Sequence, residues 1–224
     1  FADADLNKAV PGAGMAVFGN TGQVCLAGSR IFVERPIYDE FVERLSRFAE
    51  GLVVGDSTDP DTEIGPLVSA RQLDRVSGYL EAGPAEGART VTGGQRLTHG
   101  ALGAGYFVAP TVLADVRDDM RIAREEIFGP VASVLPFDSF DEVAKRANST
   151  NYGLAGGVWT RDLGKAHQMA QAITSGLLWV NTYNQFDPAV PFAGAKMSGW
   201  GSEWGSSVID DYMHTQSIWI NTEI

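Results

Sequence analysis

Residues 131–180 read VASVLPFDSFDEVAKRANSTNYGLAGGVWTRDLGKAHQMAQAITSGLLWV, and this stretch decides the fold class. The apolar run at residues 131–135 predicts a buried strand. Ser139, with Glu142 three residues later, forms a capping-box pattern that predicts the start of a helix over residues 140–147. The same alternation continues through a strand, a helix and a strand at residues 157–160, 163–173 and 177–180. Strands separated by helices of this length imply parallel pairing, so the fold class is α/β.

The N-terminal half shows the same alternation of helices and strands. Apolar spacing predicts helices over residues 6–18 and 38–52, with a short strand over residues 30–34 between them. A third helix opens at Ser69 and ends near Gly83, and a β-rich stretch is expected around residues 106–108. We expect one domain over residues 1–207 and a separate C-terminal segment over residues 208–224, whose strand-like residues 217–221 would dock on a partner subunit.

Charge and composition exclude several classes of function. The 224 residues contain 17 Lys and Arg against 28 Asp and Glu, a net charge of −11 that would repel phosphate backbones, so nucleic acid is not an expected partner. No apolar run is long enough to cross a bilayer. Cys25 is the single cysteine, which excludes an internal disulfide and a Cys-rich zinc site and predicts a reducing, cytoplasmic location; no metal ligand is assigned. The chain begins at Phe1 without a signal peptide, and we expect it to start downstream of its gene's start.

Three motifs could carry chemistry. Cys25 lies in the small-residue loop GNTGQVCLAGS at residues 19–29, which leaves the thiol accessible. Residues 125–130, EEIFGP, place two carboxylates and an aromatic ring beside a rigid turn. Residues 180–199 follow a predicted parallel strand, at the end of a sheet where α/β folds bind ligands. Each motif alone is also compatible with buried packing or a solvated surface.

Together and in this order, the motifs resemble those of the NAD(P)-dependent aldehyde dehydrogenase superfamily. GQVC with AGSR at residues 22–30 resembles the catalytic cysteine signature, EEIFGP at residues 125–130 resembles the Glu-Glu-x-Phe-Gly-Pro element, and PFAGAKMSG at residues 191–199 resembles the Pro-Phe-Gly-Gly-x-Lys-x-Ser-Gly loop. The resemblance covers nearly the whole chain. It implies the catalytic-domain fold of that family, which is a three-layer domain with a mainly parallel open sheet and helices on both faces.

The resemblance also implies a role for individual residues. Cys25 would be the nucleophile that forms a thiohemiacetal and then a thioester. Glu126 would hydrogen-bond the nicotinamide ribose of NAD or NADP, Phe128 would pack near the nicotinamide, and Gln72 would lie near the cofactor. The positions that would line the aldehyde channel are Val24, Phe186 and Phe192. The partners implied are a small-molecule aldehyde and further subunits in a homodimer or homotetramer.

The sequence departs from the family pattern at several points. Ala193 replaces the first glycine of the usual pair, which would be costly only if its φ were positive, and Ser202 stands where many relatives carry arginine. The family's dinucleotide-binding domain, general-base glutamate and oxyanion-hole asparagine all precede a segment resembling residues 1–6. We therefore expect the 224-residue chain alone not to oxidise aldehydes. The choice of NAD or NADP, of aldehyde, and of water or coenzyme A as acyl acceptor stays open.

Two other readings remain open at this point. The first is a cysteine hydrolase or acyltransferase in which His99, His167 or His214 acts as the base for Cys25. The second is a non-enzymatic oligomerisation module in which Cys25 only packs. Loss of an esterase signal in His→Ala variants would favour the first, and slow, pH-independent alkylation of Cys25 would favour the second.

Overall fold

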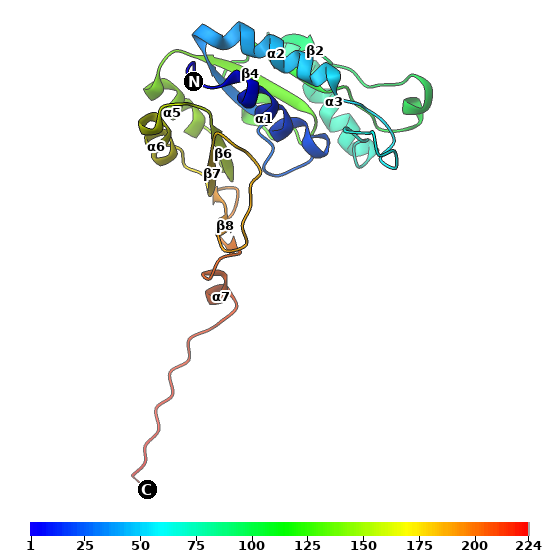
Figure 1. The fold of residues 1–224 in the computed structure, drawn as a ribbon. Helices are drawn as coiled ribbons and strands as arrows, with labels where there is room; N and C mark the ends of the chain where they lie inside the picture. The colour runs from blue at the N-terminus through cyan, green and yellow to red at the C-terminus, as the bar shows by residue number, and fades with distance from the viewer. Residues whose placement is uncertain (224) are drawn as a thin grey trace.

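The computed structural model describes residues 1–223 and is built around a four-stranded sheet with the order β1-β4-β3-β2 (Figure 1). Its strands are β1 (Arg30–Glu34), β2 (Arg89–Thr92), β3 (Thr111–Ala114) and β4 (Val131–Phe137). The strands β1, β4 and β3 pair in parallel, and β2 pairs antiparallel with β3 at one edge. The predicted α/β class is therefore confirmed.

Helices cover both faces of this sheet. The helices α1 (Leu6–Phe18) and α2 (Tyr38–Gly51) pack on one face, and α3 (Ala70–Ala85) and α4 (Arg121–Arg124) pack on the other. Side chains of β4 alternate between the two cores: Val131 and Leu135 join the α3 side, whereas Ala132 and Val134 join the α1–α2 side. This period of two is what a strand buried on both faces requires, and it confirms the three-layer arrangement.

A second, two-stranded parallel sheet lies beside the first and carries its own helices (Figure 1). It pairs β6 (Ala155–Val158) with β7 (Leu177–Val180). The helices α5 (Phe140–Asn148) and α6 (Leu163–Ala172) pack against it. Their shared core consists of Phe137, Val143, Val158 and Met169, each at least nine-tenths buried.

Short elements complete the chain. Antiparallel two-residue pairs join β5 (Tyr152–Gly153) to β9 (Ala195–Lys196) and β8 (Phe192–Ala193) to β10 (Ser202–Glu203). The single-turn and 3-10 helices are η1 (Gly19–Gly22), η2 (Arg35–Ile37), η3 (Gly100–Ala104) and α7 (Val208–Asp211). Beyond α7, residues 212–223 extend away from the body without helix or strand (Figure 1).

Pairing of residues 217–221 with a partner subunit therefore stays a prediction, as does the division of the chain into residues 1–207 and 208–224. No helix among residues 1–223 has the length and apolarity of a membrane span.

Two predicted elements are placed differently in the structure. The strand expected at residues 157–160 is β6 at Ala155–Val158, because its register is set by β7: Ala155 pairs with Leu177 and Val158 with Val180. The stretch at residues 106–108 makes only an isolated bridge, between Arg96 and Val108, rather than a strand. Phe107 and Val108 are buried, which explains why this stretch is apolar. Apart from the bridge to Arg96, no strand pairs with the stretch among the residues described.

Candidate active site

Cys25 lies in the turn that leads from η1 to β1, and its thiol is free and exposed. The backbone around it is held at both sides. The N–H of Ala27 donates to the carbonyl of Val24 at 3.0 Å, and the N–H of Gly28 donates to the carbonyl of Ala16 in α1 at 3.0 Å. The loop thus presents an exposed thiol on a main chain that is held at both sides, an arrangement suited to a nucleophile.

The entry to this loop is a run of left-handed backbone. Asn20, Thr21 and Gly22 have φ values of 50°, 59° and 66°. A β-branched residue rarely adopts this conformation, at a cost of roughly 1–3 kcal/mol that the surroundings must offset. The hydroxyl of buried Thr21 donates to the carbonyl of Gly65 at 3.2 Å, and Gly22 packs directly against the carbonyl of Gly129. The cysteine loop is therefore in contact with the loop of the second motif.

The two carboxylates of that second motif, residues 125–130, have different surroundings. Glu125 accepts a hydrogen bond from the Tyr79 hydroxyl at 2.9 Å and pairs with Arg121 at 3.1 Å. The hydrogen bond from Arg121 and then that from Tyr79 lower the pKa of Glu125 below its ordinary value. Glu126 is exposed, and among residues 1–223 its carboxylate has no ion-pair or hydrogen-bond partner. Of the two, Glu126 is the carboxylate available to a ligand.

Helix α3 holds the backbone of the same loop. The side-chain amide of Gln72 donates to the carbonyl of Phe128 at 2.7 Å. Arg75, one turn later, donates to the carbonyl of Ile127 at 3.4 Å and to that of Glu126. Phe128 needs this support because its φ is +60°, a strained value for an aromatic residue. The geometry therefore gives Gln72 a positioning role, through the loop.

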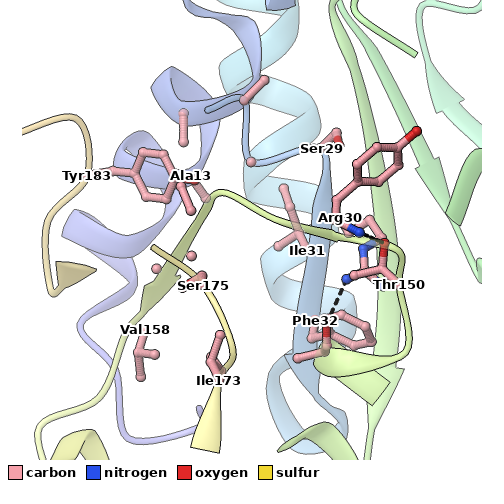
Figure 2. A pocket seen from close by; sticks show the side chains of 18 of the residues that line it. Ala13, Ser29, Arg30, Ile31, Phe32, Thr150, Val158, Ile173, Ser175 and Tyr183 are labelled. Carbon is pink, nitrogen blue, oxygen red and sulfur yellow. Dashed lines mark hydrogen bonds between the residues drawn. The ribbon is translucent and has the colours of Figure 1, made fainter. Parts of the chain in front are cut away.

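A cavity of about 530 Å³ brings most of the predicted site residues together. Val24, Cys25, Glu126 and Phe128 all line it, and Gln72 does not. Figure 2 shows the part of this cavity that is lined by Ile31, Phe32 and Val158. Val24 also lines a second cavity of about 460 Å³ on the side of residues 181–185. Val24 thus borders both cavities, and Cys25 borders the first.

The two predicted channel phenylalanines lie in an aromatic cluster. The ring of Phe186 lies 5.7 Å from that of Trp179 and 5.8 Å from that of Trp204, and the ring of Phe192 lies 5.6 Å from Trp204. Neither phenylalanine lines the two cavities that meet at Val24. The structure therefore does not bring Phe186 and Phe192 together with Cys25 in one cavity, and their channel role stays a prediction.

Tyr183 and Arg75, which were not predicted as site residues from the sequence, contact the Cys25 loop and the loop at residues 125–130. The Tyr183 hydroxyl donates to the carbonyl of Leu26, next to Cys25, at 2.8 Å, and burial raises the pKa of Tyr183 above its ordinary value. Tyr183 stands within a stretch already singled out, but no pattern distinguished it from its neighbours. Arg75 could have been found, because it lies one helical turn from Gln72 and so on the same helix face.

The remaining candidate groups lie elsewhere. His99, His167 and His214 are exposed and line neither of the two cavities at Val24. This placement disfavours a thiol hydrolase with a histidine base, which requires the base within hydrogen-bond reach of the thiol. In the part of the chain that the structure describes, no three His, Cys, Asp or Glu side chains gather as metal ligands.

Comparisons of the sequence and of the structure with known proteins all give the same family. The sequence model of the aldehyde dehydrogenase family matches residues 1–218. The chain is 50% identical over 221 residues to a putative aldehyde dehydrogenase, DhaS, of Bacillus subtilis (strain 168), covering 99% of this chain and 44% of the relative. It is 48% identical to a betaine aldehyde dehydrogenase of Rhizobium etli, covering 98% and 45%. An NAD+ complex structure of an aldehyde dehydrogenase from Bacillus cereus superposes with a TM-score of 0.94 at 47% identity, covering 100% of this chain and 45% of that one. The chain therefore spans less than half the length of these relatives.

Proposed function

The chain belongs to the aldehyde dehydrogenase family, and from that premise we propose that it supplies the nucleophile and the nicotinamide-facing loop of an enzyme that oxidises an aldehyde to a carboxylic acid. The observation that supports this most directly is the cavity lined by the free thiol of Cys25 together with Glu126 and Phe128. A nucleophile and a cofactor loop on one cavity are what hydride transfer between neighbouring atoms needs.

Cys25 would act at the carbonyl carbon of the aldehyde. Its thiolate forms the C–S bond while the carbonyl π electrons move to oxygen, which gives a thiohemiacetal after the oxyanion gains a proton. Among residues 1–223 the backbone N–H of Cys25 donates to no protein acceptor, so it is free to stabilise the oxyanion. Loss of hydride from the same carbon, with the hydroxyl proton passing to solvent, would leave a thioester on Sγ. Attack of water or another acceptor on its acyl carbon would break the C–S bond and return the thiolate.

The loop at residues 125–130 fits a nicotinamide nucleotide. The carboxylate of Glu126 is exposed with its acceptor sites free, as a partner of ribose hydroxyls must be. Phe128 is half-buried at the same cavity, and its backbone is held by Gln72. When bound, NAD or NADP supplies the hydride acceptor. Glu126 and Phe128 would hold and orient it, which are positioning roles.

The C-terminal segment supports a proposal about assembly. Ile218, Trp219 and Ile220 are 72%, 95% and 79% exposed, which is unusual for large apolar side chains outside an interface. We propose that residues 217–221 pair with a partner subunit in a homodimer or homotetramer. A cytoplasmic location is proposed because the single cysteine must stay reduced to act.

The nucleophile can be tested on the chain itself, because Cys25 is its only thiol and alkylation is visible as one mass increment. We expect propanal to slow the alkylation of Cys25 by iodoacetamide at concentrations that leave glutathione unprotected, and propan-1-ol to have no effect. Equal protection of Cys25 and glutathione by propanal would contradict a site that binds and adds aldehydes. The chain with propanal and NAD should form no NADH.

The assignment also predicts the behaviour of the complete gene product. Cys25→Ala should abolish aldehyde-dependent NADH formation, while Ser57→Ala, at an exposed position away from the cavity, should leave it unchanged. Retained turnover in the Cys25→Ala enzyme would refute the nucleophile assignment. Glu126→Gln should slow hydride transfer with little loss of acylation, and an unchanged single-turnover hydride rate would refute the ribose role.

A further inference from the structure

A chain of hydrogen bonds leads from Tyr183 to the main chain of Cys25. The Tyr183 hydroxyl donates to the carbonyl of Leu26 at 2.8 Å. The N–H of the same peptide group, which belongs to Ala27, donates to the carbonyl of Val24 at 3.0 Å. The N–H of that second peptide group belongs to Cys25, and among residues 1–223 it donates to no protein acceptor. Two peptide groups therefore connect the Tyr183 hydroxyl to the free N–H at the thiol.

The bonds of this chain run in one direction, which lets them strengthen one another. A carbonyl that accepts a hydrogen bond draws electrons from its own peptide group, so the N–H of that group becomes a stronger donor. Such cooperation strengthens a bond by about 10–30% for each bond added to the chain. The Tyr183 hydroxyl therefore increases the positive charge on the hydrogen of the Cys25 N–H.

The ring of Tyr183 is fixed by its neighbours. It lies 4.6 Å from the ring of Trp179, whose indole N–H donates to the carbonyl of Gln185 at 2.8 Å. A Cβ on Gly157 would lie 2.7 Å from the Tyr183 ring, so the backbone of β6 reaches the ring only because residue 157 is glycine. The hydroxyl end is close to Gly28, where a Cβ would lie 3.8 Å from the oxygen. The hydroxyl is therefore held at the cysteine loop by packing on several sides.

The hydroxyl also keeps its proton. Burial raises the pKa of Tyr183 above its ordinary value near 10, so the group is a donor throughout the neutral range. Its acceptor belongs to Leu26, which is buried as well. A hydrogen bond between buried groups is electrostatically stronger than the same bond in water.

We infer that Tyr183 is a positioning residue that strengthens the oxyanion donor of the Cys25 site, acting through the Leu26–Ala27 and Val24–Cys25 peptide groups. The inference rests on the proposed role of Cys25 as the nucleophile. Loss of a whole oxyanion donor slows acyl transfer by roughly 100- to 1,000-fold. Weakening one donor by about 10–30% on that logarithmic scale corresponds to a slowing of about two- to eightfold.

Two reactions of the same thiol separate this effect from a general disturbance of the loop. With p-nitrophenyl acetate the thiolate forms a C–S bond to the acetyl carbon, the carbonyl electrons move to oxygen, and their return expels p-nitrophenolate. With iodoacetamide the thiolate displaces iodide, and no oxyanion forms. Both reactions need the thiolate, so the ratio of their rates does not depend on the thiolate fraction. Both are measured in the complete gene product from the mass of the peptide that contains Cys25.

Tyr183→Phe should lower the ratio of acylation to alkylation by about two- to eightfold. Tyr106→Phe is the matched control, because it removes a hydroxyl from an exposed tyrosine that lines neither cavity at Val24, and its ratio should equal that of the parent. A loop that only loosens would change both rates together. An unchanged ratio in Tyr183→Phe would overturn the inference.

If the phenylalanine variant does not fold, 3-fluorotyrosine in place of Tyr183 keeps the ring and the hydroxyl. Fluorine withdraws electrons and makes the hydroxyl a stronger donor, so the ratio should rise above that of the parent. A ratio equal to or below that of the parent would overturn the inference. A parent enzyme that p-nitrophenyl acetate does not acylate at Cys25 would contradict the nucleophile itself, which is a different result from an acylated parent with an unchanged ratio in the variants.

Discussion

Gly22→Ala is the substitution that most directly tests the contact between the two motif loops. A Cβ at position 22 would lie 2.0 Å from the carbonyl oxygen of Gly129, 2.3 Å from its carbon and 2.8 Å from the nitrogen of Pro130. All three atoms belong to the backbone, so no flexible side chain can move aside. The φ of Gly22 is also +66°, which an L-residue with a side chain adopts only under strain.

The expected loss of stability has two parts. Placing Ala in the left-handed region costs about 1–2 kcal/mol. Displacing the buried backbone of Gly129 and Pro130 is an overpacking change that costs about 1–3 kcal/mol. Gly22→Ala should therefore lower the free energy of unfolding by about 2–5 kcal/mol. It should also change the rate at which Cys25 reacts with Ellman's reagent, since the shifted loop carries the thiol.

Gly19→Ala is the matched control, because it makes the same chemical change in the same loop. Gly19 has a φ of −50°, and a Cβ there would meet nothing within 4 Å. We expect a change of stability within about 0.5 kcal/mol in either direction. Urea unfolding of both variants and the parent, followed by far-ultraviolet circular dichroism, measures the difference. Equal midpoints for Gly22→Ala and Gly19→Ala would refute the proposed contact.

Two pH-dependent effects follow from buried hydrogen bonds. Burial raises the pKa of Tyr38 to about 12, and the Tyr38 hydroxyl donates to the Val134 carbonyl and accepts from the N–H of Asp115. Tyrosine ionises near pH 10 in an unfolded chain. The stability that protonated Tyr38 contributes is therefore fully present below pH 10 and is lost as the pH rises through about 12. Tyr38→Phe should cost about 1–2 kcal/mol at pH 7 and make the alkaline loss shallower in urea titrations, and an unchanged alkaline slope would contradict this. Burial alone would raise the pKa of Asp3, but the hydrogen bonds to its carboxylate, the first from the Thr160 hydroxyl, outweigh burial and lower the pKa. The stability that ionised Asp3 contributes is therefore lost as the pH falls below about 4. Asp3→Asn should reduce the acid-side slope of urea midpoints, and an equal slope in the two chains would exclude a contribution from Asp3.

The sequence predicted the helices and the strand alternation well where local chemistry determines the outcome. The helix start predicted at Ser139 is present, since the Ser139 hydroxyl accepts from the N–H of Glu142 at 3.3 Å. The second bond of the predicted capping box is displaced by one residue, because the Glu142 carboxylate accepts from the N–H of Asp138 at 2.9 Å. Strand positions were less accurate where side chains are small. Ala155, Gly156 and Gly157 carry almost no apolar signal, and their place in β6 depends on pairing with β7, which no local pattern contains.

For the site, the motifs supplied candidate residues but not the contacts between them. Cys25, Glu126 and Phe128 were found from short patterns and do share one cavity. The hydrogen bonds from Arg75 and Tyr183 that hold the two loops join residues far apart in the sequence, so a linear motif does not contain them.

The two departures from the family pattern lie opposite each other. Ala193 in β8 pairs with Ser202 in β10. Ala193 is not among the residues of positive φ, so replacing glycine there strains nothing in the backbone. The tight contact at this position involves its carbonyl instead: a Cβ on Gly176 would lie 1.6 Å from the Ala193 oxygen. The glycine at position 176, which matches the family pattern, thus allows the backbone of residues 193 and 194 to approach to a distance that any side chain at position 176 would prevent.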